Sequence, residues 1–132
     1  MYQLAYKLAM ELFRETKSFP KDEKYSLTDQ IRRSARSIGA QISEAWAKRQ
    51  YEKHFLSKLT DSDGEQQETQ HWIGVAFDCD YLSEAQGRDL VDKCLEIGRM
   101  LGGMMSKSEL FCRELPPSMH EEPAEYVTNV DD

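Results

Sequence analysis

The chain has 132 residues, with 17 Lys+Arg against 24 Asp+Glu and a formal net charge of −7. Hydrophobic residues make up 39% and charged residues 31%, which excludes a collagen-like or intrinsically disordered chain. The length suits one domain and excludes a multidomain enzyme. No stretch approaches the roughly 20 apolar residues that a bilayer span needs, so we expect no membrane partner.

The cysteines and the amino-terminal residues indicate a cytoplasmic location. The three cysteines are an odd number, lie far apart and form no CxxC motif, which is typical of a reduced protein. The first residues do not resemble a signal peptide, because Lys7 is followed closely by Glu11 and Glu15. We therefore expect a cytoplasmic protein.

Charge is unevenly distributed along the chain. Residues 26–58 hold seven bases and three acids, a net of +4, whereas residues 59–132 hold five bases and seventeen acids, a net of −12. The last twenty residues alone contribute −5. The basic second quarter is therefore the segment best suited to meet an anionic partner.

Apolar residues at helical spacing predict two helices in the first half of the chain. The first covers residues 2–17 and ends before Pro20, since proline cannot continue the hydrogen-bonded ladder. The second covers residues 26–49, with Ser26 and Asp29 as a capping box at its start. Its core stripe is Leu27, Ile31, Ala35, Ile38, Ile42 and Ala45.

Two further helices are predicted in the second half. Residues 52–82 have apolar ends and a polar middle, and we favour one long helix over a break around residues 61–64, although Gly64 is unfavourable there. Residues 84–111 carry an apolar stripe with the rhythm of a helical bundle. Residues 113–132 contain three prolines and scattered acids, which indicates a flexible acidic tail.

Four amphipathic helices of this size bury their stripes by packing on one another. The sequence therefore predicts an all-α, antiparallel up-down four-helix bundle over residues 1–112. The disordered acidic tail over residues 113–132 is no part of that bundle.

A run of residues in the predicted second helix resembles the signature of the S23 family, the 23S rRNA intervening-sequence proteins. The run begins upstream with Phe19-Pro20 and continues from Gln30-Ile31-Arg32-Arg33-Ser34-Ala35 to Ser43-Glu44-Ala45. Phe55-Leu56, the stretch over residues 64–70 and Tyr81-Leu82 extend the likeness over residues 1–111. The chain departs from the pattern at Gly39-Ala40-Gln41 and at Ala45, where the family often has Pro-Ala-Asn and Gly.

The resemblance implies an up-down bundle that assembles into a ring, typically a homopentamer, with no established enzyme activity. On this basis we expect a non-enzymatic scaffold or accessory protein whose first partner is itself. The alternative is RNA or ribonucleoprotein binding through the basic face of the second helix, or binding of another protein partner.

Basic residues of the second helix are the candidates for contact with an anionic partner. Arg32 and Arg36 are four residues apart and share a helix face. The full set is Arg32, Arg33, Arg36, Lys48 and Arg49. The alternative interpretation is a solvated face, or ion pairs across a subunit interface with acids of the third and fourth helices.

The predicted third helix has polar residues at inward positions, among them Gln66 and Thr69. Such positions either face water or hydrogen-bond to another chain. The candidates for an oligomer interface or ring lumen are Gln30, Gln41, Glu44, Trp46, Gln66 and Thr69. Simple exposure is the alternative for the polar positions of the third helix.

Metal and catalytic motifs are incomplete. Glu68 and His71 form half of a di-iron helix motif, but neither His54 nor His120 has a glutamate three residues before it. The acids over residues 61–65 do not continue as a calcium loop. We therefore expect no metal, no cofactor and no catalytic residue.

Overall fold

The computed structural model describes residues 1–112, and every regular element in that range is helical. The predicted all-α class is therefore confirmed for this part of the chain. The predicted acidic tail, residues 113–132, lies outside the described residues.

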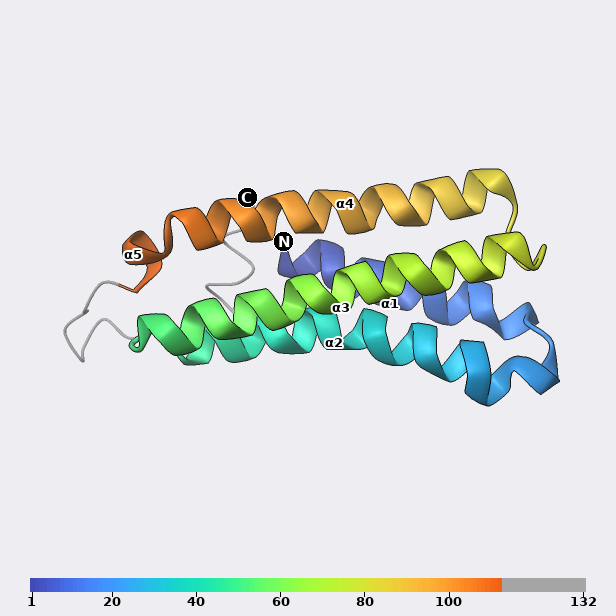
Figure 1. The fold of residues 1–132 in the computed structure, drawn as a ribbon, viewed down its shortest axis with the longest axis horizontal. Helices are drawn as coiled ribbons and strands as arrows, with labels where there is room; N and C mark the ends of the chain where they lie inside the picture. The colour runs from blue at the N-terminus through green and yellow to red at the C-terminus, as the bar shows by residue number, and fades with distance from the viewer. Residues whose placement is uncertain (113–132) are drawn as a thin grey trace.

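Four long helices form the body of the molecule and lie side by side along its long axis (Figure 1). They are α1 (Tyr2–Glu15), α2 (Asp29–Ala47), α3 (Glu52–Asp78) and α4 (Glu84–Ser106). Helix α2 packs against α1 and α3, and α4 packs against α3 and α1. Within residues 1–112, no helix is both long enough and apolar enough to cross a bilayer.

One hydrophobic core is enclosed by these four helices. The stripe of α2 is buried from Ile31 to Ala45, and the stripe of α4 is buried from Leu90 to Met104. Cys94 belongs to this core and is fully buried, which raises its pKa to about 12. Cys94 therefore remains a packed thiol, as a small apolar side chain would.

The chain enters α2 differently from the prediction. Two 3-10 turns (Thr16–Ser18 and Lys21–Glu23) lead into a π-helical turn, Lys24–Thr28. Because Ser26 already lies inside this turn, it does not cap α2, and no side chain caps that helix start. The predicted capping box at Ser26 is therefore wrong.

Helix α3 runs unbroken through Gly64, so the preference for one long helix is confirmed. It ends at Asp78 instead of continuing to residue 82. Asp80 adopts the left-handed conformation with φ of 64°. Its amide donates to the Phe77 carbonyl at 2.9 Å, and the Tyr81 amide donates to the Ala76 carbonyl at 2.9 Å. These two bonds are those of a Schellman motif, which closes the helix.

Helix α4 begins with a capping box that the sequence analysis missed. The Gln86 amide donates to Ser83 Oγ at 3.1 Å, and the Ser83 amide donates to Gln86 Oε1 at 2.8 Å. The signal, a serine followed three residues later by glutamine, was present in the sequence. The predicted helix over residues 84–111 is interrupted at Lys107, after which the short α5 (Ser108–Phe111) places Phe111 against Trp46 and Phe55.

The two connections at the other end of the body contact each other through aromatic rings. The Phe19 and Tyr81 rings lie 5.4 Å apart between centroids. The Tyr81 hydroxyl donates to Glu23 Oε2 at 2.9 Å, and this bond raises the pKa of Tyr81 to about 12. The loop before α2 is thereby held against the loop before α4.

Replacing Asp80 by glycine should stabilise the fold. Glycine has no Cβ penalty in the left-handed region, so Asp80→Gly should raise the free energy of unfolding by about 1 kcal/mol. Urea unfolding followed by circular dichroism measures this change. Asp92→Gly, at an exposed site inside α4, is the control and should leave stability unchanged or slightly lower. A loss of stability in Asp80→Gly would contradict the left-handed conformation of residue 80.

Candidate functional site

The candidate basic residues of α2 do not form one surface. Arg32 turns toward α1, where its Nε donates to Thr16 Oγ1 at 2.7 Å and its Nη2 donates to the Phe13 carbonyl at 3.3 Å. Its guanidinium also lies 4.8 Å from the centre of the Phe13 ring. Arg32 therefore helps to fasten α1 to α2.

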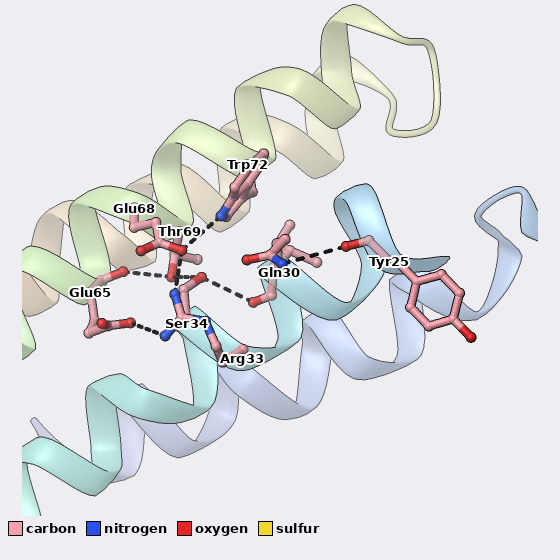
Figure 2. Close-up of polar contacts among 9 residues, drawn as sticks. Tyr25, Gln30, Arg33, Ser34, Glu65, Glu68, Thr69 and Trp72 are labelled. Carbon is pink, nitrogen blue, oxygen red and sulfur yellow. Dashed lines mark hydrogen bonds and ion pairs between the residues drawn. The ribbon is translucent and has the colours of Figure 1, made fainter. Parts of the chain in front are cut away.

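Arg33 turns the other way, toward α3 (Figure 2). Its Nη1 pairs with Glu65 Oε2 at 3.2 Å and its Nη2 pairs with Glu68. Trp72 Nε1 donates to the same Glu68 carboxylate at 3.0 Å. The hydrogen bond from Trp72 and the bond and charge of Arg33 lower the pKa of Glu68. The predicted ion pairs with acids of the third helix thus exist for Arg33, but inside one chain.

Arg36 remains exposed between the other two arginines. The structure gives it no hydrogen bond or ion pair within residues 1–112, and its guanidinium lies 5.7 Å from the centre of the Phe13 ring. Lys17 approaches the same ring to 4.8 Å. A shallow groove of about 530 Å³ runs along this side of α2, lined by Asp29, Arg32, Arg33, Arg36, Ser37 and Ala40.

Lys48 and Arg49 lie at the other end of α2, away from this groove. Lys48 is exposed at the helix end. The Arg49 guanidinium packs 4.8 Å from the Trp46 ring, and Arg49 Nη1 donates to the Trp46 carbonyl at 3.1 Å. The five candidate bases thus fall into two groups, since three of them line the groove and the other two lie at the far end of α2.

The inward polar positions of α3 are buried within the chain. Ser62 and Thr69 are fully buried and Gln66 is 5% exposed. Ser62 Oγ donates to the Ile38 carbonyl at 2.9 Å. Thr69 Oγ1 donates to Ser34 Oγ at 2.9 Å (Figure 2). The alternative of simple exposure therefore does not hold for these three side chains. The hydroxyls of Ser62 and Thr69 are hydrogen-bonded to α2 of the same chain.

We call Ser34, Ser62, Gln66 and Thr69 the polar seam. Gln66 differs from the others because its amide meets α3 and α4 instead of α2. Its Nε2 donates to Asp63 Oδ1 at 3.0 Å, and its Oε1 accepts from Gln70 Nε2 at 2.7 Å. Opposite lies Gly98, where an added Cβ would come within 2.9 Å of Gln66 Nε2. Glycine at that position therefore leaves room for the amide.

The other interface candidates do not join the polar seam. Glu44 pairs with Lys58 at 3.0 Å, and Gln30 Nε2 donates to the Tyr25 carbonyl at 3.5 Å. Gln41 is half-buried, and its Oε1 is buried without a hydrogen-bond partner among the described residues. Trp46 is 3% exposed and packs in the core beside Phe111.

An apolar surface on α1 was missed by the sequence analysis. Tyr6 is 60% exposed and Met10 is 39% exposed. The ring of Tyr2 lies 6.3 Å from that of Tyr6, and half-buried Phe13 continues the row. The sequence does contain a signal for this surface. Residues 2, 6, 10 and 13 are apolar or aromatic at helical spacing, beside the buried stripe of Ala5, Leu8 and Leu12. We call these four residues the α1 stripe.

The half di-iron motif has a structural use instead. Glu68 is engaged by Arg33 and Trp72, and the His71 ring lies against the Trp72 ring with centroids 4.8 Å apart. Within residues 1–112, the structure brings together no group of three or more His, Cys, Asp or Glu side chains suited to a metal ion.

Comparison with known proteins identifies the family. The profile of the 23S rRNA-intervening sequence proteins matches residues 1–103. The chain belongs to this family. A crystal structure of an S23 ribosomal protein family member from Bacteroides thetaiotaomicron VPI-5482, described as a protein with unknown function, superimposes with a TM-score of 0.71. The two share 24% identity, over 79% of this chain and 96% of that one, so the likeness shows a common fold. No curated protein matches the chain.

The Glu68 contacts predict a pH dependence of stability. Because the folded-state pKa of Glu68 lies below its usual 4.5, the unfolded chain takes up this proton first as the pH falls. The stabilisation is therefore complete above pH 4.5 and is lost as the pH falls through the folded-state value. Glu68→Gln should lower the free energy of unfolding at neutral pH, and its difference from the wild type should shrink in acid.

Urea unfolding at about pH 7 and about pH 3 measures both differences. Glu96→Gln is the matched control, since Glu96 is exposed on α4 and makes none of these contacts. If Glu68→Gln lowers the free energy of unfolding by the same amount at both pH values, the charge of the carboxylate is not what stabilises the fold.

Proposed function

We propose that this chain is a non-enzymatic helical scaffold that assembles with copies of itself in the cytoplasm. Residues 1–112 form an antiparallel up-down four-helix bundle, and several bundles join into a ring-like homo-oligomer. The exposed α1 stripe carries this proposal. It is a row of large apolar side chains on the outside of a bundle whose core is already filled.

The composition of this surface favours a protein partner. Tyr, Met and Arg are enriched at the centres of protein interfaces, where lysine and acids are depleted. Tyr6 and Met10 provide exposed apolar area. Arg36 lies over Phe13, the last residue of the α1 stripe. Burial of such side chains in an oligomer removes apolar surface from water, which is the main driving force of association.

The family comparison is compatible with a role that involves no reaction. Neither the family description nor that of the solved relative names a catalytic activity. Glu68, a carboxylate whose pKa is lowered, is held by Arg33 and Trp72. It is therefore a structural group between α2 and α3.

Introducing a charge into the α1 stripe should dissolve the oligomer. Tyr6→Glu places a carboxylate in the middle of the proposed contact, where burial without a partner is costly. Size-exclusion chromatography with light scattering should show an oligomer for the wild type and a smaller species for the variant. Tyr25→Glu is the control, because Tyr25 is 75% exposed but lies before α2, off the stripe. A monomeric wild type would contradict the proposal.

RNA binding is the second candidate, and one observation favours it. Lys17, Arg32 and Arg36 gather around the Phe13 ring, and none of them forms an ion pair with a carboxylate in residues 1–112. Aromatic rings beside cations are also the elements with which proteins hold single-stranded nucleic acid. In this second proposal, RNA binds to the surface around Phe13 and not along the whole basic segment of residues 26–58.

A charge reversal at this cluster tests the RNA proposal. Lys17→Glu combined with Arg36→Glu should abolish retention of labelled poly(U) in a filter-binding assay at low salt, because phosphate contacts dominate such affinity. Arg99→Glu combined with Lys107→Glu makes the same change of charge at exposed sites in and after α4. Equal retention by both double variants would reject the Phe13 cluster as the binding face.

A further inference from the structure

We propose that an acidic segment of this chain, residues 121–125, docks on the groove along α2 and covers it against other anions. The segment lies outside the described residues and contains three glutamates, Glu121, Glu122 and Glu125. This inference goes beyond the proposed scaffold and does not depend on it. It gives the groove a partner within its own chain.

Three cations beside the groove have no carboxylate partner within residues 1–112. Lys17 and Arg36 are exposed and lie over the Phe13 ring. Arg32 is half-buried, and its hydrogen bonds go to a hydroxyl and to a backbone carbonyl. Neither acceptor carries a charge that offsets the guanidinium. An excess of positive charge therefore remains on this surface.

The carboxylates along the groove are already paired with other bases. Asp29, the acid that lines the groove, pairs with Lys24 at 3.4 Å. Glu65 and Glu68 of α3 both pair with Arg33. Because each of these acids already has a base, an anionic partner for the three unpaired cations comes from outside residues 1–112.

The shape of the groove suits a short extended peptide. The groove is shallow, has a volume of about 530 Å³ and is lined along α2 from Asp29 to Ala40. These two residues are about 16 Å apart along the helix axis, at 1.5 Å per residue. Five residues of extended chain span about 17 Å. The length of the acidic segment therefore matches that of the groove.

The acidic segment is also within reach. The Phe111 ring lies 6.0 Å from the Trp46 ring, so the last described residues lie beside the carboxyl end of α2. Arg36 precedes Trp46 by about 15 Å along the helix. The chain from Cys112 to Glu121 can span about 30 Å when extended. The segment of the same chain can therefore reach the groove.

Charge and tethering favour this occupant over a separate molecule. The three glutamates of the acidic segment would meet the three unpaired cations, which is the complementarity that gives a charged contact its specificity. A segment attached to the same chain has a high effective concentration at the groove. Contacts between exposed charges, each of them weak, are then sufficient for docking.

Carbodiimide cross-linking of the full chain tests the contact. The reagent joins an amine directly to a carboxylate, so peptide mass spectrometry should find Lys17 linked to the acidic segment. Arg36→Glu should lower the yield of this product severalfold. So should a rise in salt from about 50 to 500 mM, since salt screens exposed charges. Arg99→Glu, the same change at an exposed site of α4, is the control and should leave the yield unchanged.

Co-expression of two variants shows which chain supplies the segment. A Lys17→Arg chain lacks the amine, and a chain with Glu121→Gln, Glu122→Gln and Glu125→Gln, the segment variant, lacks the carboxylates. Neither chain can form the cross-link within itself. In the co-expressed mixture the product can arise only between chains, and we expect none.

Neutralising the acidic segment should expose the groove to other polyanions. The segment variant should elute from a heparin column at higher salt than a matched variant with Asp92→Asn, Glu96→Gln and Glu109→Gln. The matched variant loses three exposed acids of α4 and α5, so the net charge of both chains changes equally. When both also carry Arg36→Glu, the difference in elution should disappear.

Three results would overturn the inference. The first is an absent Lys17 product, or one whose yield is unchanged by Arg36→Glu. The second is a product from the co-expressed pair, which would assign the segment to a neighbouring copy. The third is equal elution of the two triple variants, which would show that the segment leaves the groove uncovered. A monomeric wild type would contradict the proposed scaffold and leave this inference standing.

Discussion

The requirement that buried polar groups be hydrogen-bonded governs how α2 and α3 meet. Thr69 and Ser62 of α3 are buried, and their hydroxyls find acceptors at Ser34 and at the Ile38 carbonyl of α2. A shift of one helix along the other by a turn would take the Ser62 hydroxyl away from the Ile38 carbonyl, and a buried donor left unpaired costs about 1–3 kcal/mol. Thr69 would lose Ser34 but keep the Glu65 carbonyl of its own helix, to which its hydroxyl also donates at 2.8 Å. The polar seam therefore sets the register of the two central helices.

This register determines which charges are used inside the bundle and which remain outside. Arg33 comes directly before Ser34, so the alignment that pairs Ser34 with Thr69 also brings Arg33 to Glu65 and Glu68 (Figure 2). Arg36 lines the same groove as Arg33 but lies nearer α1, with its guanidinium 5.7 Å from the centre of the Phe13 ring. The same helix thus uses one arginine to join α3 and leaves another at the surface on which the proposed functions depend.

Much of the fold could be predicted from the sequence, because helix periodicity is a local property. The helix class and the buried stripes of α2 and α4 follow from residue spacing, and the continuity of α3 from the absence of proline. Helix ends were less predictable. The π-helical turn places Ser26 before the start of α2, which has no side-chain cap, and the left-handed Asp80 closes α3 before residue 82. Both are set by backbone conformations that residue spacing does not reveal.

The sequence by itself determined that the chain is helical, which positions are apolar, and that its two halves carry opposite charge. Only the tertiary structure decided that the polar positions of α3 are buried against α2, since a periodic pattern shows a face without showing its neighbour. It also placed three of the five basic candidates on one groove and two at the far end of α2, and it left Tyr6, Met10 and Leu95 uncovered within residues 1–112. The exposure of a side chain depends on which other helices cover it, so the sequence of one helix does not determine it.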